Sequence, residues 1–174
     1  PQPLPGHRML SAYRRQPVAG PVTVHELGLD GDQVGNTRVH GGPEKAIYAY
    51  PLSGYDGWRA AFPDLADRFV PGAMGENLTT EGLLETELWI GDRLEVGKLQ
   101  LEVTEPRAPC FKFAARMGYP QAIKHMLQSG FTGVYLKVIT PAEIAAAEVI
   151  RVLAGPREVS VTDINRQRLK GRQR

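Results

Sequence analysis

A single cysteine stands in a short segment that ends a predicted strand, Pro106-Arg107-Ala108-Pro109-Cys110-Phe111-Lys112. The two prolines turn the chain sharply and so fix the position of the Cys110 thiol. Arg107 and Lys112 flank this thiol, and their positive charge favours the thiolate, the form that ligates a metal or attacks an electrophile. The alternative is a buried cysteine that packs as a small apolar side chain. The local sequence leaves both interpretations open.

A second candidate is the glycine-rich segment Val39-His40-Gly41-Gly42-Pro43-Glu44-Lys45. Its paired glycines let backbone N–H groups converge on an anion, such as a phosphate, without side chains in the way. Arg38 and Lys45 would add positive charge, and His40 could donate a proton near neutral pH. The alternative is a plain Gly-Gly-Pro turn capped by His40, because the segment matches neither the phosphate-loop nor the dinucleotide-binding pattern.

The third candidate is the segment Gly72-Ala73-Met74-Gly75-Glu76-Asn77-Leu78-Thr79, which leads into a predicted strand. The amide of Asn77 could bind a polar ligand there, although a structural Asx turn explains the residue equally well. The other histidines, His7, His25 and His125, lack the spacing of zinc ligands. We therefore do not expect a zinc site.

These segments need a scaffold, and the pattern of the chain predicts one made mainly of strands. Apolar alternation and tight turns predict strands within residues 22–25, 46–50, 88–103 and 133–139. The 19 glycines and 14 prolines divide the chain into the short segments that are typical of barrels and sandwiches. Helical spacing occurs at residues 53–62 and 120–130, which we expect to cover barrel openings. A capping box at Ser160 predicts a further short helix, up to Leu169.

The composition indicates one globular domain. A chain of 174 residues with 42% hydrophobic and 23% charged residues can bury a core, which excludes disordered and fibrous classes. The formal net charge is only +2. Much of the basic excess lies close to the end of the chain, at Arg166, Arg168, Lys170, Arg172 and Arg174. We interpret this end as a solvated tail, and we expect no specific nucleic-acid binding.

The single cysteine and the hydropathy of the chain predict a location. One cysteine cannot form an intramolecular disulfide, which favours a reducing compartment. No apolar run reaches the roughly 20 residues that span a bilayer, and the first residues do not resemble a signal peptide. We therefore expect a cytoplasmic protein that does not interact with membranes.

The candidate segments share their order and spacing with a known family, over a match from about Ser11 to Asn165. The matching motifs are Ser11-Ala12, residues 26–32, Val39-His40-Gly41-Gly42-Pro43, Tyr50-Pro51, Gly75-Glu76-Asn77-Leu78, Gly91-Asp92 and Pro106-Arg107-Ala108-Pro109-Cys110. On these motifs the chain resembles the MOSC domain family, and within it the bacterial YiiM-like branch.

The resemblance implies a fold and a domain organisation. The fold is mainly β (α+β), a closed MOSC-type β-barrel with a few short covering helices. Residues 1–155 would form this barrel domain. Residues 156–174 would form a short, basic, C-terminal helical segment, a truncated remnant of the small three-helix domain of the family.

The resemblance also implies a site for the molybdenum cofactor (molybdopterin). Cys110 would be both catalytic and the metal ligand, and His40 would be the catalytic proton donor. The implied cofactor-binding residues are Arg15, Arg38, Gly41, Gly42, Lys45, Asn77, Arg107 and Lys112. Arg15 departs from the family pattern, which usually has a lysine there. An arginine can bind phosphate but cannot readily act as an acid or a base.

The implied activity is the reduction of N-hydroxylated compounds, including N-hydroxylated purine base analogues, in a detoxification role. Electrons would come from a flavoprotein reductase. An alternative from another class is a carrier of molybdenum cofactor, or a sulfur-delivery module, in which Cys110 holds the cofactor or a persulfide without turnover. A third interpretation is a thiol-dependent enzyme without metal. We also expect that the chain can form a homodimer.

Overall fold

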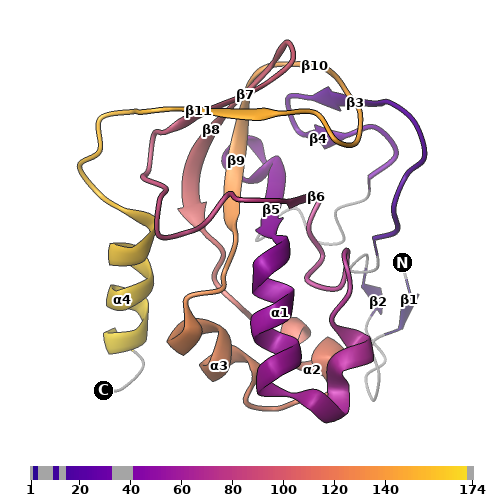
Figure 1. The fold of residues 1–174 in the computed structure, drawn as a ribbon, viewed down its shortest axis with the longest axis vertical. Helices are drawn as coiled ribbons and strands as arrows, with labels where there is room; N and C mark the ends of the chain where they lie inside the picture. The colour runs from indigo at the N-terminus through magenta and orange to yellow at the C-terminus, as the bar shows by residue number, and fades with distance from the viewer. Residues whose placement is uncertain (1, 4–9, 12–14, 33–40, 172–174) are drawn as a thin grey trace.

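The computed structural model describes residues 2–3, 10–11, 15–32 and 41–171 (Figure 1). They form a mixed α+β fold built mainly from sheet, and its largest part is a six-stranded sheet in the order β11-β7-β8-β9-β5-β6. In this order the strands are Ile150–Leu153, Arg93–Val96, Leu99–Pro106, Val134–Thr140, Ile47–Pro51 and Leu78–Thr80. β5 and β6 run parallel, and the other neighbours run antiparallel.

Two smaller sheets accompany the large one. β10 (Ala142–Ile144), β3 (Val22–His25) and β4 (Gly28–Leu29) form a three-stranded sheet, and β1 (Gln2–Pro3) pairs with β2 (Leu10–Ser11). β9 ends at Thr140 and β10 begins at Ala142, so the chain passes from the large sheet to the three-stranded sheet at Pro141. Proline has no N–H to donate to a strand partner, which explains why the ladder changes there.

The large sheet curls into a half-barrel, and the prediction of a closed barrel is wrong for the described residues. The edge strands β11 and β6 each have one neighbour in this sheet, β7 and β5 respectively. Closure needs a continuous ladder around the barrel. Here β6 is only three residues long, and the chain beyond β9 joins a different sheet. The mainly β class with a few helices is confirmed.

The helices agree with the predicted spacing in three places. α1 (Leu52–Ala61), α3 (Ala122–Ser129) and α4 (Val161–Gly171) lie where helices were predicted. The capping box of α4 is confirmed, because the N–H of Asp163 donates to Oγ of Ser160 (3.0 Å). The strand predicted at residues 88–90 is wrong: Trp89 forms a single bridge to Ser160 there.

One helix was not predicted. α2 (Phe111–Met117) begins directly after Cys110, whose side chain makes no capping hydrogen bond. Two short 3-10 helices, η1 (Pro43–Lys45) and η2 (Pro63–Arg68), complete the described elements. α1, α2 and α3 gather at the end of the large sheet away from β3 and β4 (Figure 1). Across the described ranges, no helix combines the length and the apolar character that crossing a membrane requires.

Strand β5 divides the core into two clusters because both of its faces are buried. Ile47 and Ala49 point into an aliphatic cluster inside the curled sheet. Tyr48 and Tyr50 point to the other side, into an aromatic cluster with the helices. There the indole N–H of Trp58 donates to the Tyr50 hydroxyl oxygen (2.9 Å), and burial raises the pKa of Tyr50 well above its ordinary value. The helices are thus fixed to the sheet through β5.

Gly133 connects α3 to β9 and lies directly against β5. It has a left-handed φ of 63°, and a Cβ there would come within 2.4 Å of the Ala49 carbonyl oxygen. Gly130 also has a left-handed φ, 76°, but a Cβ there would meet nothing within 4 Å. The two glycines therefore share one backbone constraint and differ in the space around them.

We predict that Gly130→Ala lowers the free energy of unfolding by about 1 kcal/mol, the usual cost of a left-handed alanine. Gly133→Ala should cost roughly 1–3 kcal/mol more, because the added methyl group must displace the backbone of β5. Urea denaturation of both variants and the parent measures this difference. Equal midpoints for the two variants would contradict the close approach of Gly133 to β5.

Candidate functional site

A loop of residues 72–77 forms the centre of the candidate site, and three arginines bind its successive carbonyl groups. The pairs are Arg116 Nε with Ala73 (3.3 Å), Arg107 Nη1 with Met74 (2.5 Å) and Arg15 Nη1 with Gly75. These arginines come from α2, from the segment after β8, and from the segment before β3. The loop thereby connects the segment before β3 with residues 107–116, two parts of the chain that are distant in sequence.

Glu76 closes the same loop from inside. Its side chain is only 3% exposed. Oε1 accepts hydrogen bonds from the Gly72 N–H (2.7 Å), the Tyr55 hydroxyl (2.5 Å) and the Thr79 hydroxyl (2.9 Å). Burial, followed by the charge of Glu76, raises the pKa of Tyr55 far above its ordinary value, so this hydroxyl stays protonated as a donor. These hydrogen bonds fix the loop. They therefore also fix the position of Asn77 relative to β5.

Asn77 extends the pairing of β6 with β5. Its N–H donates to the Tyr48 carbonyl (2.7 Å), and its Oδ1 accepts from the Tyr48 N–H (2.9 Å). Its Nδ2 donates to Oδ2 of Asp32 (2.9 Å). Both ends of the amide are thus engaged with the protein, as expected for a positioning residue.

Arg15 and Asp32 form an ion pair beside Asn77. Nε of Arg15 donates to Oδ1 of Asp32 (3.2 Å), and Nη2 donates to Oδ2 (2.5 Å). Nη1 donates to Gly75, so all three guanidinium nitrogens face groups of the protein. The side chains of Arg15 and Asp32 are 23% and 17% exposed. The positive charge of Arg15 is therefore largely neutralised by a partly buried carboxylate.

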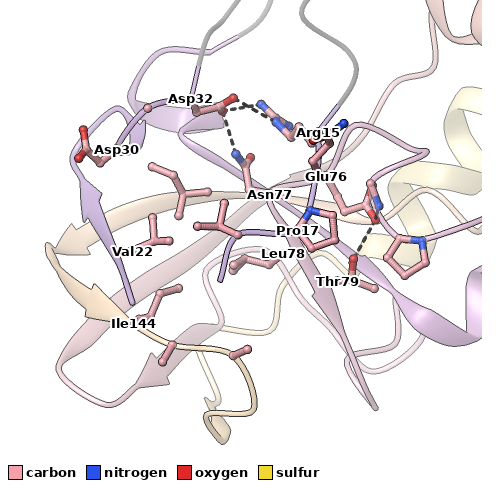
Figure 2. A pocket seen from close by; sticks show the side chains of 18 of the residues that line it. Arg15, Pro17, Val22, Asp30, Asp32, Glu76, Asn77, Leu78, Thr79 and Ile144 are labelled. Carbon is pink, nitrogen blue, oxygen red and sulfur yellow. Dashed lines mark hydrogen bonds and ion pairs between the residues drawn. The ribbon is translucent and has the colours of Figure 1, made fainter. Parts of the chain in front are cut away.

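A cavity of about 680 Å³ opens beside this ion pair (Figure 2). Arg15, Asp32 and Asn77 lie together at one end of it, and the Glu76 and Thr79 side chains meet at one side. Apolar side chains form another wall, among them Pro17, Val22, Leu29, Leu78 and Ile144. A volume of this size with a mainly apolar wall and a few polar groups is typical of a site for a small molecule.

Cys110 lies elsewhere, at the corner between β8 and α2. Its side chain is half-buried. Arg107, three residues earlier, is 5% exposed and contacts the rings of Tyr48 (4.9 Å) and Phe113 (5.2 Å). Burial lowers the pKa of Arg107, whereas the negative charges that Tyr135 and Cys110 can carry act in the opposite direction. A negative charge on Cys110 would therefore favour the charged form of Arg107, and the predicted stabilisation of a Cys110 thiolate stays a prediction.

The glycine-rich segment contributes two residues in left-handed conformations. Gly41 has φ 80° and Gly42 has φ 85°, which explains why both are glycine. Lys45, at the end of η1, forms an ion pair with Glu105 (3.0 Å) and lies 5.6 Å from the centre of the Tyr135 ring. Glu105 also pairs with Arg168 of α4 (2.8 Å). Lys112 is half-buried in the first turn of α2.

The structure thus places the predicted site residues in several groups. Arg15 and Asn77 line the cavity; Arg107, Cys110 and Lys112 lie around the β8–α2 corner; Gly41, Gly42 and Lys45 lie at η1. Among the described residues that line the cavity, Cys110 does not occur. His40 and Arg38 lie outside the described residues. The prediction that His40, Gly41, Gly42, Asn77 and Cys110 share one pocket therefore stays a prediction.

Sequence reasoning missed several residues that organise the site. Asp32 was noted only as part of the motif at residues 26–32, and Tyr48 only as a residue of a predicted strand. Arg116 was not predicted as a site residue, because it lies in the helix that was not predicted. A buried cluster such as Glu76 with Tyr55 leaves no local pattern, because its members are 21 positions apart.

Comparison with known proteins agrees with the earlier resemblance. The model of the MOSC domain family matches residues 36–151. The YiiM protein of Escherichia coli (strain K12) is 34% identical over 153 residues, which cover 88% of this chain and 68% of YiiM. The chain belongs to the MOSC domain family. The YiiM-like branch is supported by the same relative.

This chain covers different shares of its other relatives. A protein named "Reductase" from Gibberella moniliformis (strain M3125 / FGSC 7600) is 36% identical over 87% of this chain, but only 27% of that protein is covered. The crystal structure of YiiM from Escherichia coli has a TM-score of 0.77 and 31% identity, with 89% of this chain and 73% of that chain covered. YiiM from Geobacillus stearothermophilus also has a TM-score of 0.77, with 30% identity, 94% of this chain and 76% of that chain covered.

We predict that Arg107→Met destabilises the fold more than Arg116→Met does. Methionine leaves the buried Met74 carbonyl and the Tyr48 hydroxyl without their guanidinium partner, which should cost about 1–3 kcal/mol. Arg116 is only half-buried and its bond to Ala73 is longer, so its loss should cost under about 1 kcal/mol. Chemical denaturation of both variants measures this. The reverse order would contradict the role of Arg107 as the buried link.

Proposed function

We propose that this MOSC domain protein binds the molybdenum cofactor through Cys110 and reduces N-hydroxylated compounds, with electrons from a flavoprotein reductase. The observation that carries the proposal is the β8–α2 corner of a MOSC domain. There a half-buried cysteine, the only one in the chain, interacts with the buried guanidinium of Arg107. The relative from Gibberella moniliformis that is named "Reductase" supports a redox role.

The residues of this corner and those of η1 fit such a cofactor in their chemistry. A thiolate is a suitable ligand for a transition metal, and Arg107 offers it a compensating charge. Lys45 and Lys112 are half-buried cations, and they suit a phosphate together with the open backbone of Gly41 and Gly42. Arg38 would add charge, and Arg15 and Asn77 would bind the cofactor from the side of the cavity.

The proposed reaction is the cleavage of an N–O bond, which consumes two electrons and two protons and releases water. When bound, the cofactor supplies the redox-active metal for this step. The chain itself would hold the Cys110 thiolate at a fixed corner and balance its charge through Arg107. His40 would donate a proton to the leaving oxygen. The rigid 72–77 loop would keep Arg107 in place, because Met74 accepts its hydrogen bond.

We predict that Cys110→Ser loses N-hydroxy reduction but keeps its fold. Serine nearly preserves the volume, yet its hydroxyl is far less acidic and is a hard ligand. The variant without cofactor should melt close to the parent temperature, because a half-buried hydroxyl can be solvated. Thermal midpoint and turnover are measured on the same sample, with an N-hydroxylated base and an artificial electron donor.

Three outcomes of that measurement have different meanings. A destabilised but fully active Cys110→Ser variant would exclude Cys110 as the metal ligand. A parent that carries cofactor but never turns over would favour a carrier or sulfur-delivery module. Activity in protein from cells that cannot make molybdopterin would indicate a thiol-dependent enzyme without metal.

We also predict that Lys45→Ala weakens cofactor retention. A lost charge-assisted hydrogen bond to phosphate typically costs about 1.5–3 kcal/mol. The fold should persist, because Glu105 keeps its pair with Arg168. Lys170→Ala is the matched control, since Lys170 is exposed on α4. The cofactor that remains after gel filtration is measured in both variants, and equal retention would argue that the η1 segment is only a turn.

A further inference from the structure

Helix α4 is anchored beside the end of β8 (Figure 1). The Val161 side chain is buried in the aliphatic cluster, and its N–H donates to the Leu88 carbonyl (3.0 Å). Asn165 is 4% exposed, and its Nδ2 donates to Oγ1 of Thr132 (3.0 Å). The first turns of α4 are therefore fixed to the sheet and to the segment before β9, and they hold the next turn against the end of β8.

A series of hydrogen bonds leads from this anchor to Arg107. The Thr132 carbonyl accepts from the Tyr48 hydroxyl (2.7 Å), and this hydroxyl accepts from Nη1 of Arg107 (3.3 Å). Burial raises the pKa of Tyr48 well above its ordinary value, so the hydroxyl stays protonated and keeps donating to Thr132. Asn165 of α4 is thus linked through buried polar groups to the guanidinium that precedes Cys110 by three positions.

Arg168 of α4 binds the end of β8 directly. Its Nη1 donates to the Pro106 carbonyl (2.5 Å), and its Nη2 donates to Oε2 of Glu105 (2.8 Å). These two residues immediately precede Arg107 in the chain. Because a guanidinium is planar and rigid, its two bonds fix the orientation of the Glu105 carboxylate.

Glu105 divides its charge between two cations. Its Oε1 lies 3.0 Å from Nζ of Lys45, and its Oε2 faces Arg168. The side chains of Lys45, Glu105 and Arg168 are only 31%, 28% and 27% exposed, so solvent screens this group less than it screens a surface pair. Glu44, the neighbour of Lys45, faces Lys137 instead (3.9 Å). One carboxylate between two cations leaves this group of three with a net positive charge.

We propose that Arg168 is a positioning residue of the cofactor site: by holding Glu105, it keeps the charge of Lys45 available for the phosphate of the cofactor. Without Arg168, Glu105 would pair with Lys45 alone, and that pair carries no net charge. The inference rests on the proposed function for the identity of the anion. It also gives α4, expected from the sequence as a remnant of a larger domain, a part in the site.

Substitutions of Arg168 test this role with two readouts that need no turnover. The first is the molybdenum and pterin that remain on the full chain after gel filtration, in protein from a host supplied with molybdate. The second is the affinity of the cofactor-free chain for inorganic phosphate, from a phosphorus NMR titration. Arg168→Met should lower phosphate affinity roughly two- to fivefold and retain less cofactor. Arg168→Lys, which keeps the charge, should restore most of both.

A second substitution at Glu105 separates charge from structure. The double variant Arg168→Met with Glu105→Gln also lacks the hydrogen bond to Pro106, so a purely structural role predicts a loss at least as large as in Arg168→Met. Our account predicts phosphate affinity close to that of the parent, because no carboxylate is left to neutralise Lys45. Glu105→Gln alone should bind phosphate at least as tightly as the parent, which tests the claim even if Arg168→Met does not fold. A double variant no better than Arg168→Met, or weaker binding by Glu105→Gln, would overturn the proposal.

Arg166→Met is the matched control, because it removes the same charge from the same helix. The Arg166 side chain is 72% exposed, and its partner Asp163 lies on α4 itself (3.7 Å). Both readouts should stay at the parent values, and a loss equal to that of Arg168→Met would refute the role of Arg168.

The two readouts also separate this inference from the proposed function. A parent without cofactor whose phosphate affinity follows the predicted order would refute the proposed function alone. Cofactor held equally well by the parent and by Arg168→Met would refute the inference alone. A parent that binds neither cofactor nor phosphate would refute both.

Discussion

The buried guanidinium of Arg107 is the interaction on which the rest of the site depends. A charged group that is almost fully removed from water must be satisfied by the protein, and its partners then become fixed in turn. Arg107 donates to the Tyr48 hydroxyl on β5 and to the Met74 carbonyl in the 72–77 loop, and it contacts the rings of Tyr48 and Phe113. It therefore joins the sheet, the loop and the Cys110 corner.

This arrangement separates two chemical environments that the 72–77 loop connects. On the side of Arg107 the protein offers a thiol and positive charge, which suit a metal and an anionic cofactor. On the side of Arg15 the loop faces a cavity with an apolar wall, where the Arg15–Asp32 ion pair lies at one end. Arginines bind the loop at three successive carbonyls. A substitution on one side of the loop should therefore shift the positions of side chains on the other side.

Much of the fold could be predicted from local sequence. The strands β3, β5, β7, β8 and β9 follow alternating segments, and α1, α3 and α4 follow helical spacing with proline, glycine or a capping box at their ends. Helix α2 carries no such signal, since Cys110 is a poor cap. The open half-barrel could not be predicted either. It depends on which distant strand β6 pairs with and on the change of sheet at Pro141.

The candidate site was predictable in its residue types but not in its contacts. Cys110, Lys45 and Asn77 were predicted as site residues because cysteine, lysine and asparagine in glycine- and proline-rich turns suggest ligand binding. Their partners were not found, because Asp32 lies 45 positions from Asn77 and Glu105 lies far along the chain from Lys45. Pairings of this kind are set by the tertiary fold, and no local pattern records them.

The central claim is that Cys110 binds the molybdenum of the cofactor. X-ray absorption at the molybdenum edge tests it most directly, on the parent and on Cys110→Ser purified from a host supplied with molybdate. Our account predicts molybdenum in the parent, with a shell of sulfur ligands that is smaller by one sulfur in the variant. An identical sulfur shell in both proteins, or a folded parent without molybdenum, would contradict it.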